Sequence, residues 1–215
     1  LRVDTSKIFS FNRIANNETV EGGGSITYGL SYNKRNKTDK KDFLNIDLSS
    51  LIRAKENLDL PKNSSIGKKT SDIFGNIEVF PNKYLDFNYN FALDNNFNKS
   101  NYDSLSTTFY INKLKTTFEY IDEKSNIINE SFTSNFTTFE VDKRNSINFE
   151  VRRNNELSAT EYYNLIYKYK NDCLEASVVY NKQFYNEDAV NSSENIFFKI
   201  SFVPFGTINT PNVND

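Results

Sequence analysis

Hydrophobic and polar residues alternate one by one along much of the chain. The clearest case is YLDFNYNFALD, residues 84–94, in which Leu, Phe or Tyr occupies every second position from Leu85 to Leu93. Asp, Asn or Ala occupies the positions between them. Because successive side chains of a β-strand point to opposite faces of its sheet, this period of two predicts a strand with one apolar and one polar face.

The same period recurs along the chain and predicts about eleven strands. The segments are 25–34, 43–55, 71–80, 84–94, 102–112, 113–123, 131–143, 146–154, 161–170, 173–185 and 193–205. Their connections alternate between tight ones, such as 81–83 and 143–145, and longer polar ones, such as 94–101 and 186–193. This pattern indicates an antiparallel, all-β fold with two different ends.

Two architectures produce this alternation. In a soluble β-sandwich the apolar face turns inward onto a second sheet, whereas in a transmembrane β-barrel it faces lipid and the polar face lines a wet lumen. Short turns at one end and longer loops at the other are typical of outer-membrane barrels, as are aromatic residues near the strand ends. We therefore predict a transmembrane β-barrel, with the sandwich as the alternative.

Composition favours the barrel. Hydrophobic residues make up 37% of the chain and aromatic residues 15%. This hydrophobic share is low for a sandwich, which must fill a dry core from two inner faces. No apolar run reaches the length of a transmembrane helix, so strands are the expected route across a bilayer. The balance of 26 basic and 28 acidic residues shows no excess of positive charge for binding nucleic acid.

The residue inventory argues against enzymatic chemistry. The chain has no His, which excludes imidazole general bases, Ser-His-Asp triads and His-containing metal sites. Its single cysteine, Cys173, excludes an internal disulfide and a CxxC site, and is either free or paired with a group outside this chain. We expect no enzymatic activity and no cofactor.

Three segments make up the expected organisation: a polar leading segment at 1–24, the strands at 25–205 and a C-terminal tail at 206–215. Because the chain begins with Leu1 and has no Met, we expect it to be a piece of a longer protein. Eleven is an odd number, and bacterial single-chain barrels have even numbers of strands, so further strands would have to precede Leu1. The polar face would line the lumen, and its predicted lumen-facing residues are Asp86, Asn88, Asn90, Asn148 and Glu150.

Three stretches resemble a known family. FSFNRIANNETVEGGGSITYGLSYNKR, residues 9–35, resembles a segment of the lipopolysaccharide (LPS)-assembly protein LptD, with the signature Asn12, Arg13 and Ile14 before a glycine-containing strand. YNLIYKYKNDCLEASVVYNKQFY, residues 163–185, is similar to the family's pattern of strand, tight turn with Cys, and strand. IFFKISFVPFG, residues 196–206, is similar to the family's closing strand.

The resemblance implies the C-terminal portion of a very large outer-membrane barrel of Gram-negative bacteria. The full protein of this family also has a periplasmic jelly-roll domain, which is absent from this chain and connects it to periplasmic LPS bridge proteins. LPS leaves sideways between the first and last strands, and a lipoprotein, LptE, plugs the lumen. On this basis the last strand would be one lip of the lateral opening, at Ile196, Phe198, Ile200 and Phe202.

The resemblance also gives two residues expected roles. Cys173 matches the C-terminal cysteines that form disulfides to the N-terminal domain, although Asp172 stands where the family has a second cysteine. Arg13 is expected either to hold an internal carboxylate or to contact an LPS phosphate. The sequence therefore leaves three candidate functions: LPS assembly in the bacterial outer membrane, a porin-like passive channel, and carbohydrate binding by a soluble sandwich.

Overall fold

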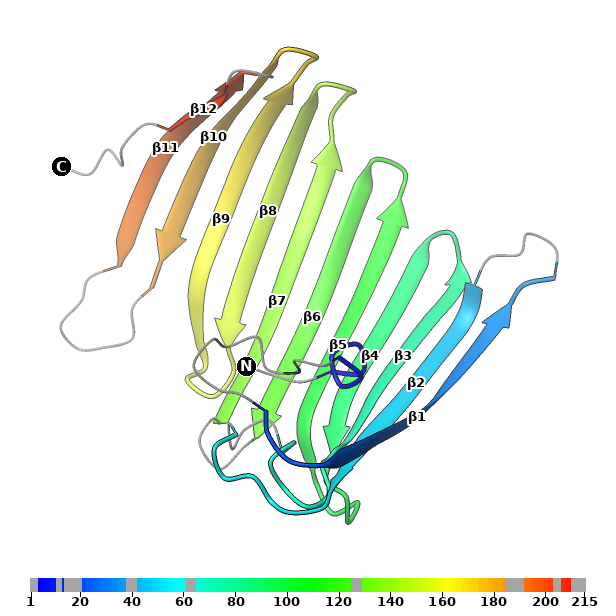
Figure 1. Cartoon of the computed structure of the whole chain (residues 1–215). Coiled ribbons are helices and arrows are strands. Elements are labelled where there is room, and N and C mark those ends of the chain that lie inside the picture. Colours follow the sequence, from blue (N-terminus) through cyan, green and yellow to red (C-terminus); the bar gives the residue numbers. More distant parts are fainter. Residues whose placement is uncertain are drawn as a thin grey trace. The chain divides into compact units, whose positions relative to one another are not determined.

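The structure is a computed structural model, which describes residues 4–10, 13, 21–37, 42–60, 65–124, 129–184, 192–202 and 206–209. Its twelve strands follow one another in a single antiparallel sheet in the order β1 to β12 (Figure 1). They are β1 (Ser25–Arg35), β2 (Asp42–Arg53), β3 (Ile73–Asn82), β4 (Leu85–Leu93), β5 (Ser100–Ile111), β6 (Leu114–Lys124), β7 (Asn129–Glu140), β8 (Asn145–Asn154), β9 (Ala159–Lys170), β10 (Leu174–Gln183), β11 (Ser193–Phe202) and β12 (Gly206–Asn209).

The all-β, antiparallel prediction is confirmed, and all eleven predicted strands are present. Among the described residues the sheet is open, with β1 and β12 as its edges, so a closed barrel remains a proposal. None of the described residues forms a helix long and apolar enough to cross a membrane. The chain divides into two compact units: a first unit of 1–106 with 121–130, and a second of 107–120 with 131–215.

The C-terminal end differs from the prediction. Gly206–Asn209, expected to be part of a tail, forms β12 and pairs with Lys199–Phe202 of β11. The strand that carries Ile196 and Phe198 is therefore not the last one. With β12 the described residues form twelve strands, so the argument from an odd strand number no longer applies to them. The prediction missed β12, which has only four residues.

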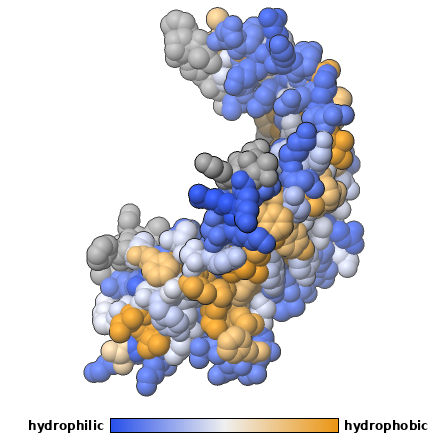
Figure 2. Space-filling view, turned by 90° about the vertical axis from the view of Figure 1, so that its right-hand side faces the viewer, coloured by the Kyte–Doolittle hydropathy of each residue, from blue (hydrophilic) through white to orange (hydrophobic). Residues whose placement is uncertain are grey.

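Strand register confirms the two faces in the first unit. Tyr32, Ile46, Ile77 and Tyr89 pair in one row across β1–β4. The side chains on this face have no layer over them at β1, where Ile26 is 72% and Leu30 66% exposed. Figure 2, which views the chain from the side of β1, shows hydrophobic residues gathered on the surface.

The second unit has the same arrangement. Phe149, Leu165, Tyr180 and Ile196 pair in one row across β8–β11, and all but Tyr180 are among its large exposed hydrophobic residues. On the opposite face of these strands, Glu150, Asn164, Asn181 and Asn195 pair in a polar row. The alternation seen in the sequence is therefore a property of the sheet and not only of single strands.

β7 is an exception. Asn135 and Thr137 lie on the same face as the apolar row of the second unit, because they pair with Val151 and Phe149. Their hydrogen-bonding groups are engaged: Asn135 Nδ2 donates to Thr116 Oγ1 over 2.9 Å, and Thr137 Oγ1 lies 2.7 Å from the same oxygen. Internal hydrogen bonding lowers the cost of placing these groups on an apolar face.

Asn and Asp build several of the turns between the strands. Asp142 Oδ1 accepts the backbone N–H groups of Arg144 and Asn145 over 2.7 and 2.9 Å. In the same way, Asn171 Oδ1 accepts those of Cys173 and Leu174 over 2.9 and 2.7 Å. Side-chain oxygens that cap backbone donors favour such turns, and the backbone hydrogen bonds hold the pKa of Asp142 below its usual value.

Candidate functional site: the polar face of the sheet

A ladder of hydrogen-bonded side chains crosses the polar face of the first unit. Asn33 Nδ2 donates to Asn45 Oδ1, and Asn45 Nδ2 donates to Glu78 Oε2 over 2.9 Å. From the other side, Asn88 Nδ2 donates to Glu78 Oε1 over 3.2 Å. The ladder thus joins β1 to β4 and ends from both directions on one carboxylate. Asn90 and Asn76 extend it with a further pair of amide hydrogen bonds.

A second ladder crosses the polar face of the second unit. Asn181 Nδ2 donates to Asn164 Oδ1, and Asn164 Nδ2 donates to Glu150 Oε2 over 3.1 Å. Tyr162 Oη donates to Glu150 Oε1 over 2.8 Å, so both carboxylate oxygens have a donor. Asn195 lies opposite Asn181 in the register, and its Oδ1 is buried without a hydrogen-bond partner.

The residues predicted to face the lumen all lie on these polar faces. Asp86, Asn88 and Asn90 share the polar face of β4, and Asn148 and Glu150 share that of β8. Asn88, Asn90 and Glu150 are members of the ladders. The described sheet is open, so the position of these residues in a lumen stays a prediction.

Glu78 allows a test of the ladders. Glu78→Gln replaces one carboxylate oxygen with an NH₂ group, which then faces the NH₂ group of an Asn, so two donors oppose each other. If the amide of Asn88 turned over to accept from this group, Asn88 Oδ1 would lose the hydrogen bond that it accepts from Asn90. We expect a loss of about 1–3 kcal/mol in stability. Thermal unfolding of the detergent-solubilised full chain would measure it, with the exposed Glu130→Gln as control. Equal unfolding temperatures for the two variants would contradict a stabilising ladder.

A small hydrophobic core covers part of the polar face of the first unit. Leu51, Phe74 and Ala92 extend from β2, β3 and β4 on the same face as the ladder. Three residues outside the strands pack on them and are at most 4% exposed: Ile8, Leu60 and Ile66. The segments that carry these three residues are therefore bound to the sheet and are not free loops.

Asp4 holds the N-terminal turn in shape. Its Oδ1 accepts the backbone N–H groups of Ser6 and Lys7 over 3.0 and 2.8 Å, and the Ser6 hydroxyl over 2.6 Å. Partial burial alone would raise the pKa of Asp4, but these hydrogen bonds and the nearby Lys7 charge outweigh it and lower the pKa. The turn places Ile8 in the core and leaves Phe9 exposed.

Arg13, the described member of the predicted signature, belongs to a buried ion cluster with Glu21 and Arg53. Both guanidinium groups donate to Glu21 Oε1, and the exposed fractions of the three side chains are 13%, 8% and 1% in the order Arg13, Glu21, Arg53. Arg13 also donates to Ile8 O over 2.6 Å and to Thr27 Oγ1 over 2.8 Å. Of its two expected roles, the structure supports holding an internal carboxylate. Asn12 and Ile14 lie outside the described residues.

Arg53 ties three parts of the first unit together. Besides Glu21, it donates through Nε to Ile66 O and through Nη1 to Gly22 O, the latter over 3.2 Å. The backbone continues the connection, because Arg53 N donates to Lys69 O and Ser71 N to Leu51 O over 2.8 and 2.9 Å. Thus the segment 65–71 is anchored along the end of β2.

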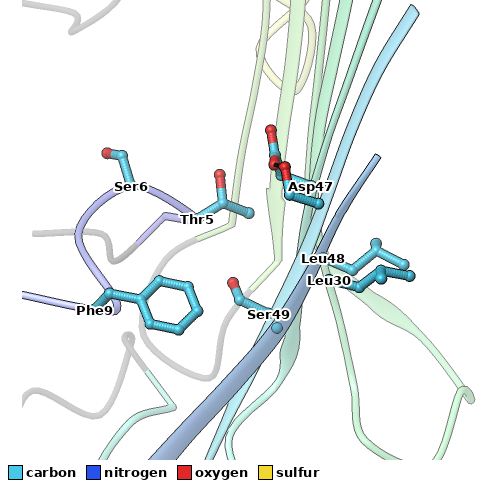
Figure 3. A pocket seen from close by; sticks show the side chains of 9 residues that line it. Thr5, Ser6, Phe9, Leu30, Asp47, Leu48 and Ser49 are labelled. Atoms are coloured by element: carbon cyan, nitrogen blue, oxygen red, sulfur yellow. Dashed lines mark hydrogen bonds between the residues drawn. The ribbon is translucent and has the colours of Figure 1, made fainter. Parts of the chain in front are cut away.

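A pocket of about 360 Å³ lies between the N-terminal turn and the polar face of β1 and β2 (Figure 3). Thr5, Ser6 and Phe9 form one wall, and Asp47 and Ser49 point toward them from β2 (Figure 3). The side chains of Leu30 and Leu48 point to the other side of the sheet (Figure 3). Ser49 is 4% exposed, and its Oγ has no hydrogen-bond partner.

A wider groove of about 830 Å³ runs over the polar face of β9, β10 and β11 in the second unit. The second ladder forms part of its floor, through Asn164, Asn181 and Asn195. Its charged residues are Lys168, Glu175 and Lys199, of which Lys168 pairs with Glu175 over 3.1 Å. The described residues contain no group of three His, Cys, Asp or Glu side chains that could hold a metal ion.

Cys173 lies in the turn between β9 and β10, exposed and as a free thiol. This turn would allow a disulfide to another part of a longer protein, so the pairing implied by the resemblance stays a prediction. Ile196, Phe198, Ile200 and Phe202 share the apolar face of β11. Among the described residues β12 pairs with this strand at Lys199–Phe202.

Sequence reasoning missed Glu21, Arg53 and the core over the polar face. Their signals are weak: Leu60 and Ile66, with Leu58, are the aliphatic residues of the otherwise polar segment 55–70. Leu51 and Phe74 occupy the polar parity of their strands, which marks a position where that face is covered rather than wet. No family model matches the chain, and no curated protein matches it.

Proposed function

We propose that the chain is the C-terminal part of an outer-membrane β-barrel that assembles LPS in the outer leaflet. The observation that carries the membrane part of this proposal is the contrast between the two faces. On one face, aromatic and aliphatic side chains are exposed and no second sheet of the described residues covers them. On the other face, amides and carboxylates are joined in the hydrogen-bonded ladders. A barrel wall needs this combination, with lipid on one side and water on the other.

A soluble sandwich fits less well. It would bury the face that carries Ile26 and Leu30 against a second sheet, but all the described strands belong to one sheet. Exposed apolar surface of this extent is a liability in water and an advantage in lipid. We therefore prefer a membrane protein to a carbohydrate-binding sandwich.

The choice of LPS assembly over a passive channel rests on the resemblance to the LptD family. Two features support it. Arg13 lies in a buried ion cluster, as a structural signature residue would, and Cys173 is exposed in a turn where a disulfide could form. A porin requires neither feature. In the proposed protein an LptE-like lipoprotein fills the lumen, and an N-terminal jelly roll outside this chain receives LPS from periplasmic bridge proteins.

The lateral opening is proposed at β11. β11 is the last long strand among the described residues, since β12 spans only four residues. The apolar residues of β11 would contact the acyl chains of LPS. The role of Ile196, Phe198, Ile200 and Phe202 as one lip of the opening follows from this proposal.

Depletion of the full-length protein in its own cells distinguishes the two membrane functions. If the protein assembles LPS, newly made LPS stops reaching the cell surface, while passive uptake of small hydrophilic solutes does not fall. If it is a channel, uptake falls and LPS continues to arrive at the surface, which would contradict the proposal. Wild-type protein supplied from a second gene copy is the control.

Cys173 gives a separate prediction. The full-length protein from cell envelopes is expected to migrate differently in electrophoresis with and without reductant, because a long-range disulfide constrains the denatured chain. Cys173→Ser should abolish the difference and Ser177→Ala, a nearby matched change, should not. Identical migration of the wild type under both conditions would remove the best residue-level reason to prefer this family to a porin.

A further inference from the structure

In the pocket between the N-terminal turn and β1–β2, the aromatic ring of Phe9 lies beside Gly29, which has no side chain. Phe9 is 58% exposed, and its ring lies over Gly29: a Cβ at position 29 would come within 2.8 Å of Phe9 Cζ. The same Cβ would lie 2.7 Å from Leu48 O, so only glycine leaves this space open. Phe9 contributes nothing to the buried core, whereas its neighbour Ile8 is completely buried.

The polar lining of the pocket has unused hydrogen-bonding capacity. Ser49 Oγ has no partner although Ser49 is 4% exposed, which is unusual because buried polar groups in native proteins are nearly always hydrogen-bonded. Asp47 Oδ1 accepts from the Ser31 hydroxyl, and no described residue donates to its Oδ2. Thr5 and Ser6 add two hydroxyl groups on the opposite wall (Figure 3).

The charge of the pocket lining limits the kind of ligand that the pocket can bind. The lining contains one carboxylate, Asp47, and no Lys or Arg side chain. Phosphate and other anions would be repelled by Asp47 and would find no cation to bind them. Hydroxyl groups of a neutral ligand can donate to Asp47 Oδ2 and exchange hydrogen bonds with the Ser and Thr hydroxyls.

We propose that this pocket binds the ring of a neutral hexopyranose. The apolar C–H face of the ring packs on Phe9, and its hydroxyls hydrogen-bond with Asp47, Ser49 and the hydroxyls of the N-terminal turn. Because Ser49 Oγ is buried, its hydrogen bond to the ligand requires a neighbouring side chain to move, and the exposed Phe9 ring lies beside Ser49 (Figure 3). The pocket volume of about 360 Å³ is at the lower end of ligand pockets, about 300–1,000 Å³, as suits a single sugar unit.

This inference rests on the proposed function only in assigning the sugar to LPS. The pocket lies on the polar face, on the opposite side of β1 and β2 from Leu30 and Leu48, where the sugar portion of LPS would be in water (Figure 3). The binding itself requires no transport. A failure to bind sugar and a failure to assemble LPS are therefore measured independently.

Saturation-transfer-difference NMR tests the proposal on the full-length protein, with methyl α-D-glucopyranoside as the probe. The protein is solubilised in lauryl dimethylamine oxide, because sugar-based detergents would compete for the pocket. With the wild-type protein, we expect saturation to be transferred from the protein to the ring protons of the glucoside. Phe9→Ala should weaken binding by about tenfold or more, since it removes the aromatic contact. Ser49→Ala should weaken it several-fold without loss of folding, because it removes a hydroxyl that has no partner in the structure.

Two controls make the result specific. Phe97→Ala removes an aromatic ring that is 69% exposed and lies outside the pocket, and should leave binding unchanged. Inorganic phosphate should not displace the sugar. The proposal is overturned if the wild type shows no transfer, if Phe9→Ala and Ser49→Ala bind as well as Phe97→Ala does, or if phosphate competes.

Discussion

Replacement of Glu21 by Gln is expected to destabilise the packing of the N-terminal turn and of segment 65–71 on the sheet by about 3–5 kcal/mol. Glu21 is the only described carboxylate that pairs with Arg13 and Arg53, and Arg53 is 1% exposed. Without the negative charge, two guanidinium groups remain in a buried site with no countercharge. The loss of one partner from a buried ion cluster costs more than the loss of an exposed pair.

Hydrogen exchange of the detergent-solubilised full chain measures this effect locally. The amide of Ile8, which donates to Asp4 O, and that of Ser71, which donates to Leu51 O, should exchange faster by about 100-fold or more in the variant. Strands β8–β11 should be unaffected. Glu56→Gln is the matched control, because Glu56 is exposed in the same connection. Exchange at Ile8 and Ser71 that matches this control would show that the cluster does not hold these segments.

A positive charge on the apolar face is expected to impair assembly into the membrane. Leu30 is 66% exposed on β1, and Leu30→Arg would place a guanidinium in lipid at a cost of about 2–4 kcal/mol if it lies near the bilayer midplane. The amount of folded full-length protein in the outer membrane should fall strongly. Folded protein is measured as the fraction that stays folded in unheated sodium dodecyl sulfate and migrates differently from the heated sample in electrophoresis.

Ser31→Arg is the control for this substitution. It adds the same side chain one position along the strand, on the polar face and beside the Asp47 carboxylate. The two variants therefore differ mainly in the face that carries the charge. If Leu30→Arg assembles as well as Ser31→Arg, the face that carries Leu30 does not contact lipid.

The strands were predictable because their signal is local. A period of two follows from backbone geometry alone, and Asn or Asp at turn positions such as Asp142 and Asn171 reinforces the boundaries. The faces could be predicted for the same reason. Once Phe87, Tyr89 and Phe91 are known to share a face, Asn88 and Asn90 must share the other.

Pairing between distant residues was not predictable. Nothing in the sequence near Glu21 indicates that Arg53 is its partner, because their contact depends on how 21–24 enters β1 and how β2 ends. Likewise, Leu51 and Phe74 break the polar parity, but only the fold shows that Ile8, Leu60 and Ile66 cover them. A short strand such as β12 has too few residues to show a period at all.

In the proposed barrel the two faces of the sheet meet different solvents, and two neighbouring residues of β10 provide the most direct test. Ser177 lies on the polar face and Val178 on the apolar face, and each can be replaced by Cys with little change in size. The test uses full-length protein embedded in lipid bilayers, in which Cys173 and its proposed partner cysteine are replaced by Ser. In this protein we predict that Ser177→Cys reacts rapidly with a water-soluble thiol reagent. A fluorescent label at Val178→Cys should instead be quenched by a lipid-borne quencher. Rapid reaction of Val178→Cys with the water-soluble reagent, or a label there that the lipid-borne quencher does not reach, would contradict the account.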